Sequence, residues 1–146
     1  ISNGIDWSPD GSFCYFTDSG EQAVYRFSIR GDQLHEKRLF FSTLHAGQPG
    51  TPDGLCVDSA GNIWSAIWDG SKIIQLSPQA EILQEIYLPV SRPTSIAFGG
   101  NDLRDLFITS ASVDLTSEQL GNQAQAGDLF HCRVEIPGRP PHFFAG

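Results

Sequence analysis

Two oxygen-bearing side chains stand at equivalent places in a sequence that repeats itself. Asn3 and Asp53 each directly precede a glycine, Gly4 or Gly54, and an alternating apolar segment follows each pair. Amide and carboxylate oxygens that converge on one point are ligands for hard divalent cations. The glycines allow close approach of the backbone. The pattern therefore points to a cation site, with Asx turns at loop-to-strand junctions as the structural alternative.

A third copy of this pattern extends the set of candidate residues. Thr94 takes the place of Asn3 and Asp53, and Ser95 takes the place of the glycine that follows them. Equivalent positions in repeated units can converge on a common axis, so Thr94 is a third candidate oxygen donor. Thr94 and Ser95 are also candidates for lining a channel or contacting a substrate.

Short strand-like segments follow each copy of the pattern. They are rich in the β-branched and aromatic residues that are typical of strands, and the pattern itself predicts the first strand of each repeat. Second strands are expected at Phe13–Asp18, Ile63–Trp68 and Leu106–Ser110, third strands at Ala23–Ile29, Lys72–Leu76 and Asp128–Val134, and fourth strands at Lys37–Phe41, Ile82–Tyr87 and His142–Phe144.

Four short antiparallel strands that recur every ~40–50 residues are typical of β-propeller blades. We therefore predict an all-β fold of about three four-stranded blades, at approximately 1–50, 51–91 and 92–146. A sandwich or a barrel is the alternative, but neither of these needs an internal repeat. The third repeat carries an insertion at about 111–126, in which Thr116 or Ser117 could cap one helical turn.

Composition and charge exclude several classes of function. The chain has 146 residues, of which 40% are hydrophobic, and this length suits about one domain with a real core. The net charge is −8 and basic residues do not cluster, so nucleic acids and anionic membranes are not expected as partners. No apolar run approaches the roughly 18 residues of a membrane-spanning helix.

The other reactive side chains form no recognisable catalytic set. The four histidines are scattered without zinc spacing, at His35, His45, His131 and His142. Neither a nucleophile elbow nor a phosphate-binding loop nor a dinucleotide fingerprint is present. We expect turn formation or structural hydrogen bonding for four aspartates: Asp6, Asp10, Asp18 and Asp58. We expect the three tryptophans to pack between blades: Trp7, Trp64 and Trp68. Widely spaced cysteines in strand-like segments predict buried free thiols and a reducing, cytoplasmic compartment: Cys14, Cys56 and Cys132.

Taken in order, three segments resemble the senescence marker protein/regucalcin and gluconolactonase family. They are Ser2–Ser8, Pro52–Asp58 and Pro93–Gly100, and the ending Pro141–Gly146 is similar to the C-terminus of that family. The resemblance covers the whole chain, including the insertion that precedes Gly127–Phe130. No single motif would suffice, but the ordered set is specific.

The resemblance implies a six-bladed propeller that holds one divalent metal ion on its axis. Family members are lactonases and related hydrolases that act on sugar lactones or organophosphate esters. The metal is held by a Glu of the first blade, the Asn of a Ser-Asn-Gly motif and the Asp of a Pro-Asp-Gly motif. Asn3 and Asp53 match the last two, and Asp53 would also be the catalytic general base. The metal would be Ca²⁺ or Zn²⁺, with Mn²⁺ and Mg²⁺ as alternatives.

By the same resemblance, the chain corresponds to the C-terminal half of the family fold. The metal-binding Glu and the substrate-contacting Arg and Asn of the N-terminal half have no counterpart here. The chain opens with Ile1 and shows no signal peptide, so a piece, a processed chain or a trimmed segment is expected. Half a ring exposes two apolar faces, which soluble monomers rarely tolerate.

Three explanations of a half-ring stay open. The other half could be a separate or cleaved chain, two copies could form a symmetric ring, or the segment could be one isolated for structural work without activity of its own. Two functions are therefore carried forward. One is a metal-dependent hydrolase of sugar lactones, and the other is a non-catalytic half-propeller that binds a divalent cation or assembles with a partner or a second copy.

Overall fold

A computed structural model describes residues 1–141, which form eleven strands in three antiparallel sheets. The first sheet contains β1 (Ser2–Trp7), β2 (Phe13–Asp18), β3 (Ala23–Arg30) and β4 (Gln33–Ser42). The second contains β5 (Thr51–Val57), β6 (Ile63–Trp68), β7 (Lys72–Leu76) and β8 (Ile82–Tyr87). The third contains β9 (Pro93–Gly99), β10 (Asp105–Ser110) and β11 (Leu129–Arg133). The predicted all-β class is confirmed.

The predicted strand bounds hold without change for β2, β6, β7 and β8. By contrast, β4 is longer than the predicted Lys37–Phe41. The reason is a tight hairpin, in which Gly31 has a φ of +65° and Arg30 already pairs with Gln33. A two-residue loop of this kind lets the ladder begin immediately after the turn. The predicted strand His142–Phe144 lies outside the described residues.

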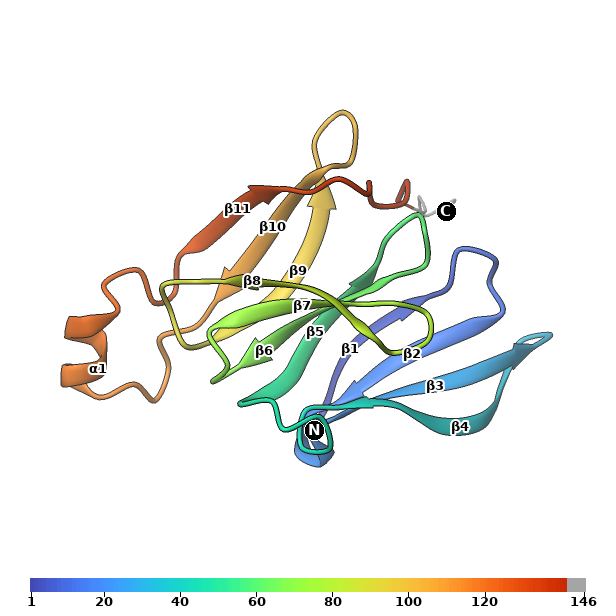
Figure 1. Cartoon of the computed structure of the whole chain (residues 1–146), viewed down its shortest axis with the longest axis horizontal. Helices are drawn as coiled ribbons and strands as arrows, with labels where there is room; N and C mark the ends of the chain where they lie inside the picture. Colours follow the sequence, from blue (N-terminus) through green and yellow to red (C-terminus); the bar gives the residue numbers. More distant parts are fainter. Residues whose placement is uncertain (142–146) are drawn as a thin grey trace.

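The three sheets are arranged as consecutive blades around their first strands. Figure 1 shows β1, β5 and β9 side by side, with the outer strands of each sheet leading away from them. One hydrophobic cluster joins the first two sheets and includes Tyr15, Val24, Leu55 and Ile74. A second cluster, centred on Trp64, joins the second and third sheets. Apolar side chains that are buried between neighbouring sheets therefore hold the blades together.

Burial of the tryptophans and cysteines follows the sheet faces. The prediction of packing between blades is confirmed for Trp64, which is 1% exposed, and is wrong for Trp7 in this chain, which is 44% exposed. Trp7 lies on β1, whose outer face has no further sheet beside it among the described residues. The cysteines are free thiols, buried at Cys14 and half-buried at Cys56 and Cys132.

The insertion in the third repeat contains one short helix, α1 (Ser117–Asn122). Thr116, one of the two residues predicted as a cap, is its N-cap, because its hydroxyl accepts a hydrogen bond from the Gln119 backbone N–H. The Gln119 side chain accepts in return from the Thr116 N–H, which completes a capping box. Within residues 1–141, no helix has the length and apolar character needed to cross a bilayer.

Gly54 lies at a close approach between the first strands of the second and third sheets. A Cβ atom added at Gly54 would stand 2.7 Å from the Ser95 Cα, closer than real Cβ contacts come. We expect Gly54→Ala to lower the free energy of unfolding by about 2 kcal/mol, because β5 and β9 must move apart to admit the methyl group. Urea unfolding followed by tryptophan fluorescence measures this change.

A matched glycine provides the control for this prediction. Gly121 lies in α1, and no described atom outside its local backbone comes within 4 Å of a Cβ added there. Gly121→Ala should therefore leave the urea midpoint unchanged or raise it slightly, since alanine favours helix. Equal midpoints for the two alanine variants would contradict the close approach of β5 and β9.

Candidate functional site

An irregularity of the first strand recurs in all three sheets. In the first sheet, three steps along β1 match two along β2, which places one extra residue at Asn3-Gly4. The second sheet has the same irregularity between Pro52 and Leu55, at Asp53-Gly54. The third has it at Thr94. Such β-bulges change the direction in which side chains point, and they are common beside active sites. The candidate residues therefore share one backbone geometry.

The first two bulges bring Asn3 and Asp53 to the same hollow, whose volume is about 390 Å³. The hollow lies at the beginnings of β1 and β5, and its lining consists of Ile1, Asn3, Ser19, Thr51, Asp53 and Trp68. Asn3 is exposed, whereas Asp53 is only 8% exposed. The site thus combines a buried carboxylate with an accessible amide.

Ser19 joins the two halves of this hollow. Its hydroxyl accepts a hydrogen bond of 3.3 Å from the Asn3 amide nitrogen. The same hydroxyl donates to the Pro52 carbonyl oxygen at 2.8 Å, across the boundary between the first and second sheets. Because the amide nitrogen of Asn3 is engaged, its amide oxygen is left to face other ligands. Ser19 therefore orients Asn3 relative to the residue that precedes Asp53.

The surroundings of the Asp53 carboxylate are those of an acidic group that can bind a cation. Burial raises the pKa of its carboxyl from 3.8 to about 6, and the neighbouring Asn3 side chain opposes part of this rise. Among the described residues, no lysine, arginine or histidine forms an ion pair with Asp53. A buried carboxylate without a compensating cation is costly. Bound metal would remove that cost.

The oxygen donors of Asn3 and Asp53 fit a hard divalent cation, since both offer amide or carboxylate oxygen. They do not complete a site by themselves. Within residues 1–141, no group of three or more His, Cys, Asp or Glu side chains is placed to hold a metal ion. Further ligands would have to come from water, from substrate or from another chain segment.

Thr94 and Ser95 lie apart from this hollow. The Thr94 hydroxyl is 2.7 Å from the Thr109 hydroxyl within its own sheet. Ser95 is exposed and lies against Gly54. In the described part of the chain, neither residue lines the hollow that Asn3 and Asp53 share. Their predicted roles as channel-lining or substrate-contacting residues stay predictions.

The other aspartates have the structural contacts expected of them. Asp10 accepts hydrogen bonds from Ser8 and Ser12 in a turn, and these lower the pKa of its carboxyl to about 2. Asp18 caps the 3-10 turn η1 (Ser19–Glu21) by accepting from the Gly20 N–H. Asp58 is fully buried and accepts from several donors.

Sequence reasoning missed four residues of the hollow, namely Ile1, Ser19, Thr51 and Trp68. Thr51 and Ser19 are ordinary loop or strand-end residues, and no spacing rule singles them out. The sequence predicts packing between blades for Trp68, although this residue ends a strand and is followed by Asp69-Gly70. Its place beside a turn was the available signal. The guanidinium of Arg92 lies 4.8 Å from the centre of the Trp68 ring, within the range of a cation–π contact.

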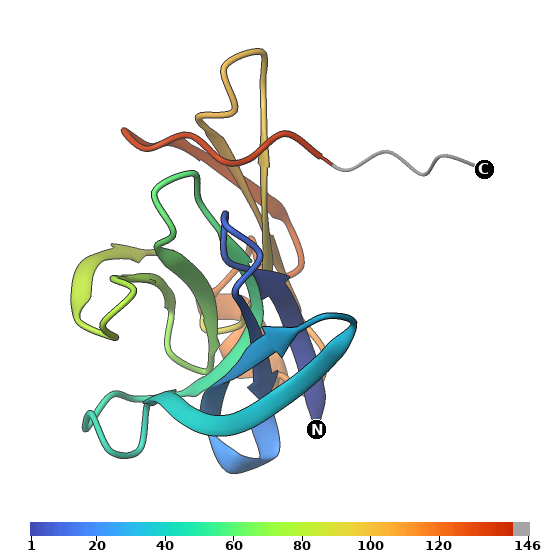
Figure 2. The ribbon, with the colours of Figure 1, turned by 90° about the vertical axis from the view of Figure 1, so that its right-hand side faces the viewer.

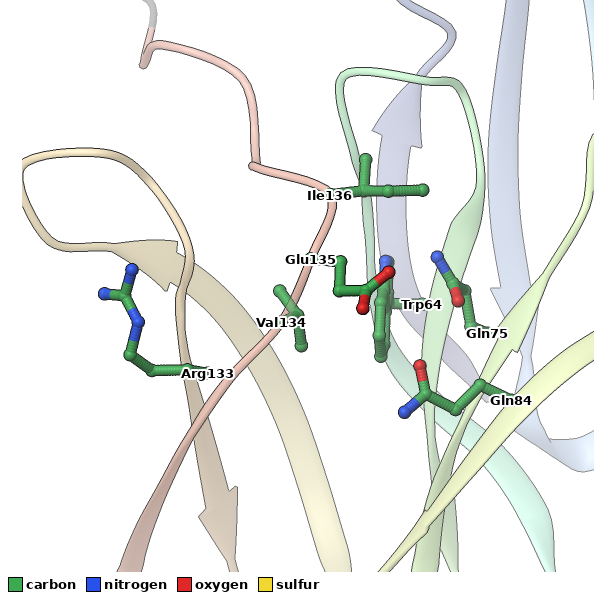
Figure 3. Close-up of a pocket in the computed structure, with 7 residues that line it drawn as sticks. All are labelled: Trp64, Gln75, Gln84, Arg133, Val134, Glu135 and Ile136. Carbon is green, nitrogen blue, oxygen red and sulfur yellow. The ribbon is translucent and has the colours of Figure 1, made fainter.

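A second hollow, of about 350 Å³, lies between the second and third sheets (Figure 3). Trp64, Gln75, Gln84 and Glu135 point into it, whereas Arg133 points away. Both Trp64 and Gln75 donate hydrogen bonds to the buried Asp58. These contacts give Trp64 and Gln75 a structural role in this hollow. None of the predicted metal ligands lines it.

Comparison with known proteins identifies a matching family and close relatives. Residues 1–112 match the family described as the SMP-30/Gluconolactonase/LRE-like region. The chain is 40% identical to a 6-deoxy-6-sulfogluconolactonase of Pseudomonas putida and 35% identical to regucalcin of Gallus gallus. In both cases all of this chain aligns with 50% of the relative.

The fold is also shared with solved structures. A calcium-binding regucalcin of Agrobacterium tumefaciens superimposes with a TM-score of 0.87 at 27% identity, and the match covers 95% of this chain and 48% of that one. The three sheets are therefore blades of a regucalcin-like β-propeller. The chain spans about half the length of the relatives that it matches.

Proposed function

Because this chain belongs to the SMP-30/gluconolactonase/LRE-like family, we propose that it supplies half of the active site of a metal-dependent sugar lactonase. The observation that carries this proposal is the buried carboxylate of Asp53, which lies beside the Asn3 amide and forms no ion pair within residues 1–141. The proposal is supported by the Pseudomonas putida relative, which is a 6-deoxy-6-sulfogluconolactonase, and by the regucalcin of Agrobacterium tumefaciens, which is a calcium-binding protein.

Asn3 and Asp53 would hold the cation through their side-chain oxygens. A bound divalent cation supplies Lewis-acid polarisation of a lactone carbonyl and makes a neighbouring water more acidic. Asp53 has a second role, because its carboxylate can act as a general base that accepts a proton from a neighbouring water. Trp68 offers a flat apolar wall on which a sugar ring can rest.

The rest of the site would come from a complementary half-propeller. Open sheet faces at both ends of the arc support this proposal. Ile5 and Leu39 on the first sheet are 51% and 47% exposed, and Leu129 on the third is 63% exposed. Apolar surface of this kind needs a cover. We take the cover to be the N-terminal half of the same fold, with a symmetric second copy as the alternative.

The free thiols fit a cytoplasmic setting.

Removal of metal tests the function. Hydrolysis of gluconolactone, followed by pH-stat titration above the spontaneous rate, should fall at least about 100-fold after EDTA treatment. The assay uses the chain joined to its complementary half, and Ca²⁺ or Zn²⁺ should restore the rate. Each of the four candidate metals is added back separately.

Two results would count against this function in different ways. Hydrolysis that survives complete chelation would contradict the metal dependence. Metal binding in calorimetry without any turnover would favour the alternative, a non-catalytic half-propeller that binds a cation. Light scattering on the chain alone, before the halves are joined, distinguishes a monomer from a symmetric ring of two copies.

A further inference from the structure

The C-terminal segment 137–139 crosses the ends of the first strands that lie opposite the Asn3–Asp53 hollow. Figure 2 shows this segment passing over the turns at the far ends of the first and second sheets. The Gly138 N–H donates at 2.7 Å to the carbonyl of Leu103, in the turn between β9 and β10 of the third sheet. The Ser59 N–H, beyond the end of β5, donates to the Pro137 carbonyl at 2.9 Å. The segment thus connects the third blade to the second.

Arg139 extends this connection to the first blade. Its guanidinium donates to the Asp6 carboxylate at 2.6 Å, and both side chains are 21% exposed. The other carboxylate oxygen of Asp6 accepts from the Val57 N–H at 2.7 Å. Arg139 also donates to the Val57 carbonyl at 3.4 Å. One side-chain pair therefore fixes the end of β1 to the end of β5.

This contact matters because β1 and β5 belong to different sheets. No backbone ladder joins them, so side-chain contacts must set how far one strand slides along the other. Asp6 is three residues beyond Asn3, and Val57 is four beyond Asp53. At ~3.3 Å per residue, the contact lies roughly 10–13 Å from the hollow, along strands that are nearly rigid. Sliding at one end would displace the residues at the other.

We propose that segment 137–139 is a strap across the three blades, and that its Asp6–Arg139 contact positions Asn3 beside Asp53. Asp6 and Arg139 are positioning residues in this scheme, since neither lines the hollow. The strap follows from the contacts of Arg139, whereas its effect on metal binding rests on the proposed function. The test therefore has one arm that needs no metal.

The first arm measures access to Cys56, which lines the groove beneath Arg139 and Pro140. We expect Arg139→Met to raise the rate of Cys56 alkylation by a maleimide about tenfold, because a charged hydrogen bond that held the strap is lost. Peptide mass spectrometry separates Cys56 from Cys14, which is 1% exposed and should stay protected. Arg133→Met is the control, since that arginine pairs with Asp102 on the third blade.

An unchanged rate at Cys56 in the Arg139→Met variant would overturn the strap. Equal acceleration at Cys14 would also overturn it, because the change would then be global unfolding. Asp6→Asn keeps the size of the side chain and should reproduce the faster alkylation if Arg139→Met does not fold.

The second arm measures the position of Asn3 and Asp53 with terbium alone, whose luminescence Trp68 can sensitise from the wall of the hollow. The dissociation constant for Tb³⁺ should rise about tenfold in Arg139→Met and stay unchanged in Arg133→Met. Faster Cys56 alkylation with unchanged terbium affinity would refute the positioning role. Failure of the unmodified chain to bind terbium would contradict the proposed metal site instead. The alkylation rate of Cys56 would then be the measurement that tests the strap.

Discussion

Replacement of Asp53 by asparagine should abolish lactone hydrolysis while it stabilises the metal-free protein. The joined propeller should lose at least about 10³-fold in kcat/KM, because asparagine neither binds a divalent cation as a carboxylate does nor accepts a proton from water. The side chain is of the same size and lies in the same hollow, so the fold is preserved. Gluconolactone hydrolysis and calorimetric metal titration measure the two losses.

The expected gain in stability follows from the sign of the pKa shift. The carboxyl of Asp53 has a pKa of about 6 in the folded chain and 3.8 as its ordinary value. The folded state therefore binds a proton more tightly than the unfolded state, and stability falls as pH rises from about 4 to about 6. Above that range, Asp53→Asn should unfold at higher urea, with a gain on the order of 1–2 kcal/mol.

Urea unfolding with EDTA present, at pH 8 and again near pH 4.5, measures this difference. The advantage of asparagine should be largest at pH 8 and shrink at the lower pH. Asp10→Asn is the matched control, because the pKa of Asp10 is lowered to about 2 by its serine contacts and its turn lies away from the hollow. Full hydrolysis by Asp53→Asn would refute the assignment, whatever its stability.

The repeat in the sequence predicted most of the fold for a definite physical reason. Each repeat carries its own alternation of apolar and polar residues and its own turns, so local patterns alone fix where strands such as Ile63–Trp68 begin and end. The equivalence of Asn3 and Asp53 was visible because repeated units place equivalent residues around one axis. The first and second sheets bring Asn3 and Asp53 into one hollow, whereas Thr94, in the equivalent position of the third sheet, does not line it.

The contacts between repeats could not be predicted in this way. The bulges at Asn3-Gly4 and Asp53-Gly54 depend on which residues pair across a sheet, which sequence spacing does not state. Ser19 connects Asn3 to Pro52 only because two different sheets meet there. Arg139 contacts Asp6 across 133 residues of sequence, and no local pattern encodes such a contact.

Asp58 shows why a buried aspartate in a repeat is not by itself a functional residue. Like Asp53 it belongs to the second repeat, and it is fully buried. Unlike Asp53, it is surrounded by hydrogen-bond donors. Its carboxylate accepts from the backbone N–H groups of Ala60 and Asn62, at 3.0 and 2.9 Å. Side-chain donors are Asn62, Trp64 and Gln75. Every oxygen is therefore engaged, and none is left for a ligand.

Asp58→Ala should accordingly destabilise the fold by about 3–5 kcal/mol, a large part of the stability of an ordinary domain. Removal of the carboxylate opens a cavity and leaves the buried donors of Trp64 and Gln75, which are seen in Figure 3, without their acceptor. Urea unfolding followed by circular dichroism measures the loss. Asp32→Ala, in an exposed hairpin turn, should change stability by less than about 0.5 kcal/mol.

The two aspartates can then be separated by one pair of measurements. Asp53→Asn is expected to lose metal binding and gain stability, whereas Asp58→Ala is expected to lose stability, with any loss of metal binding following from unfolding alone. At a temperature where the Asp58→Ala variant stays folded, its metal affinity should equal that of the unmodified chain, because Asp58 is not among the residues of the Asn3–Asp53 hollow. Weakened metal binding by a folded Asp58→Ala variant would contradict this division of roles.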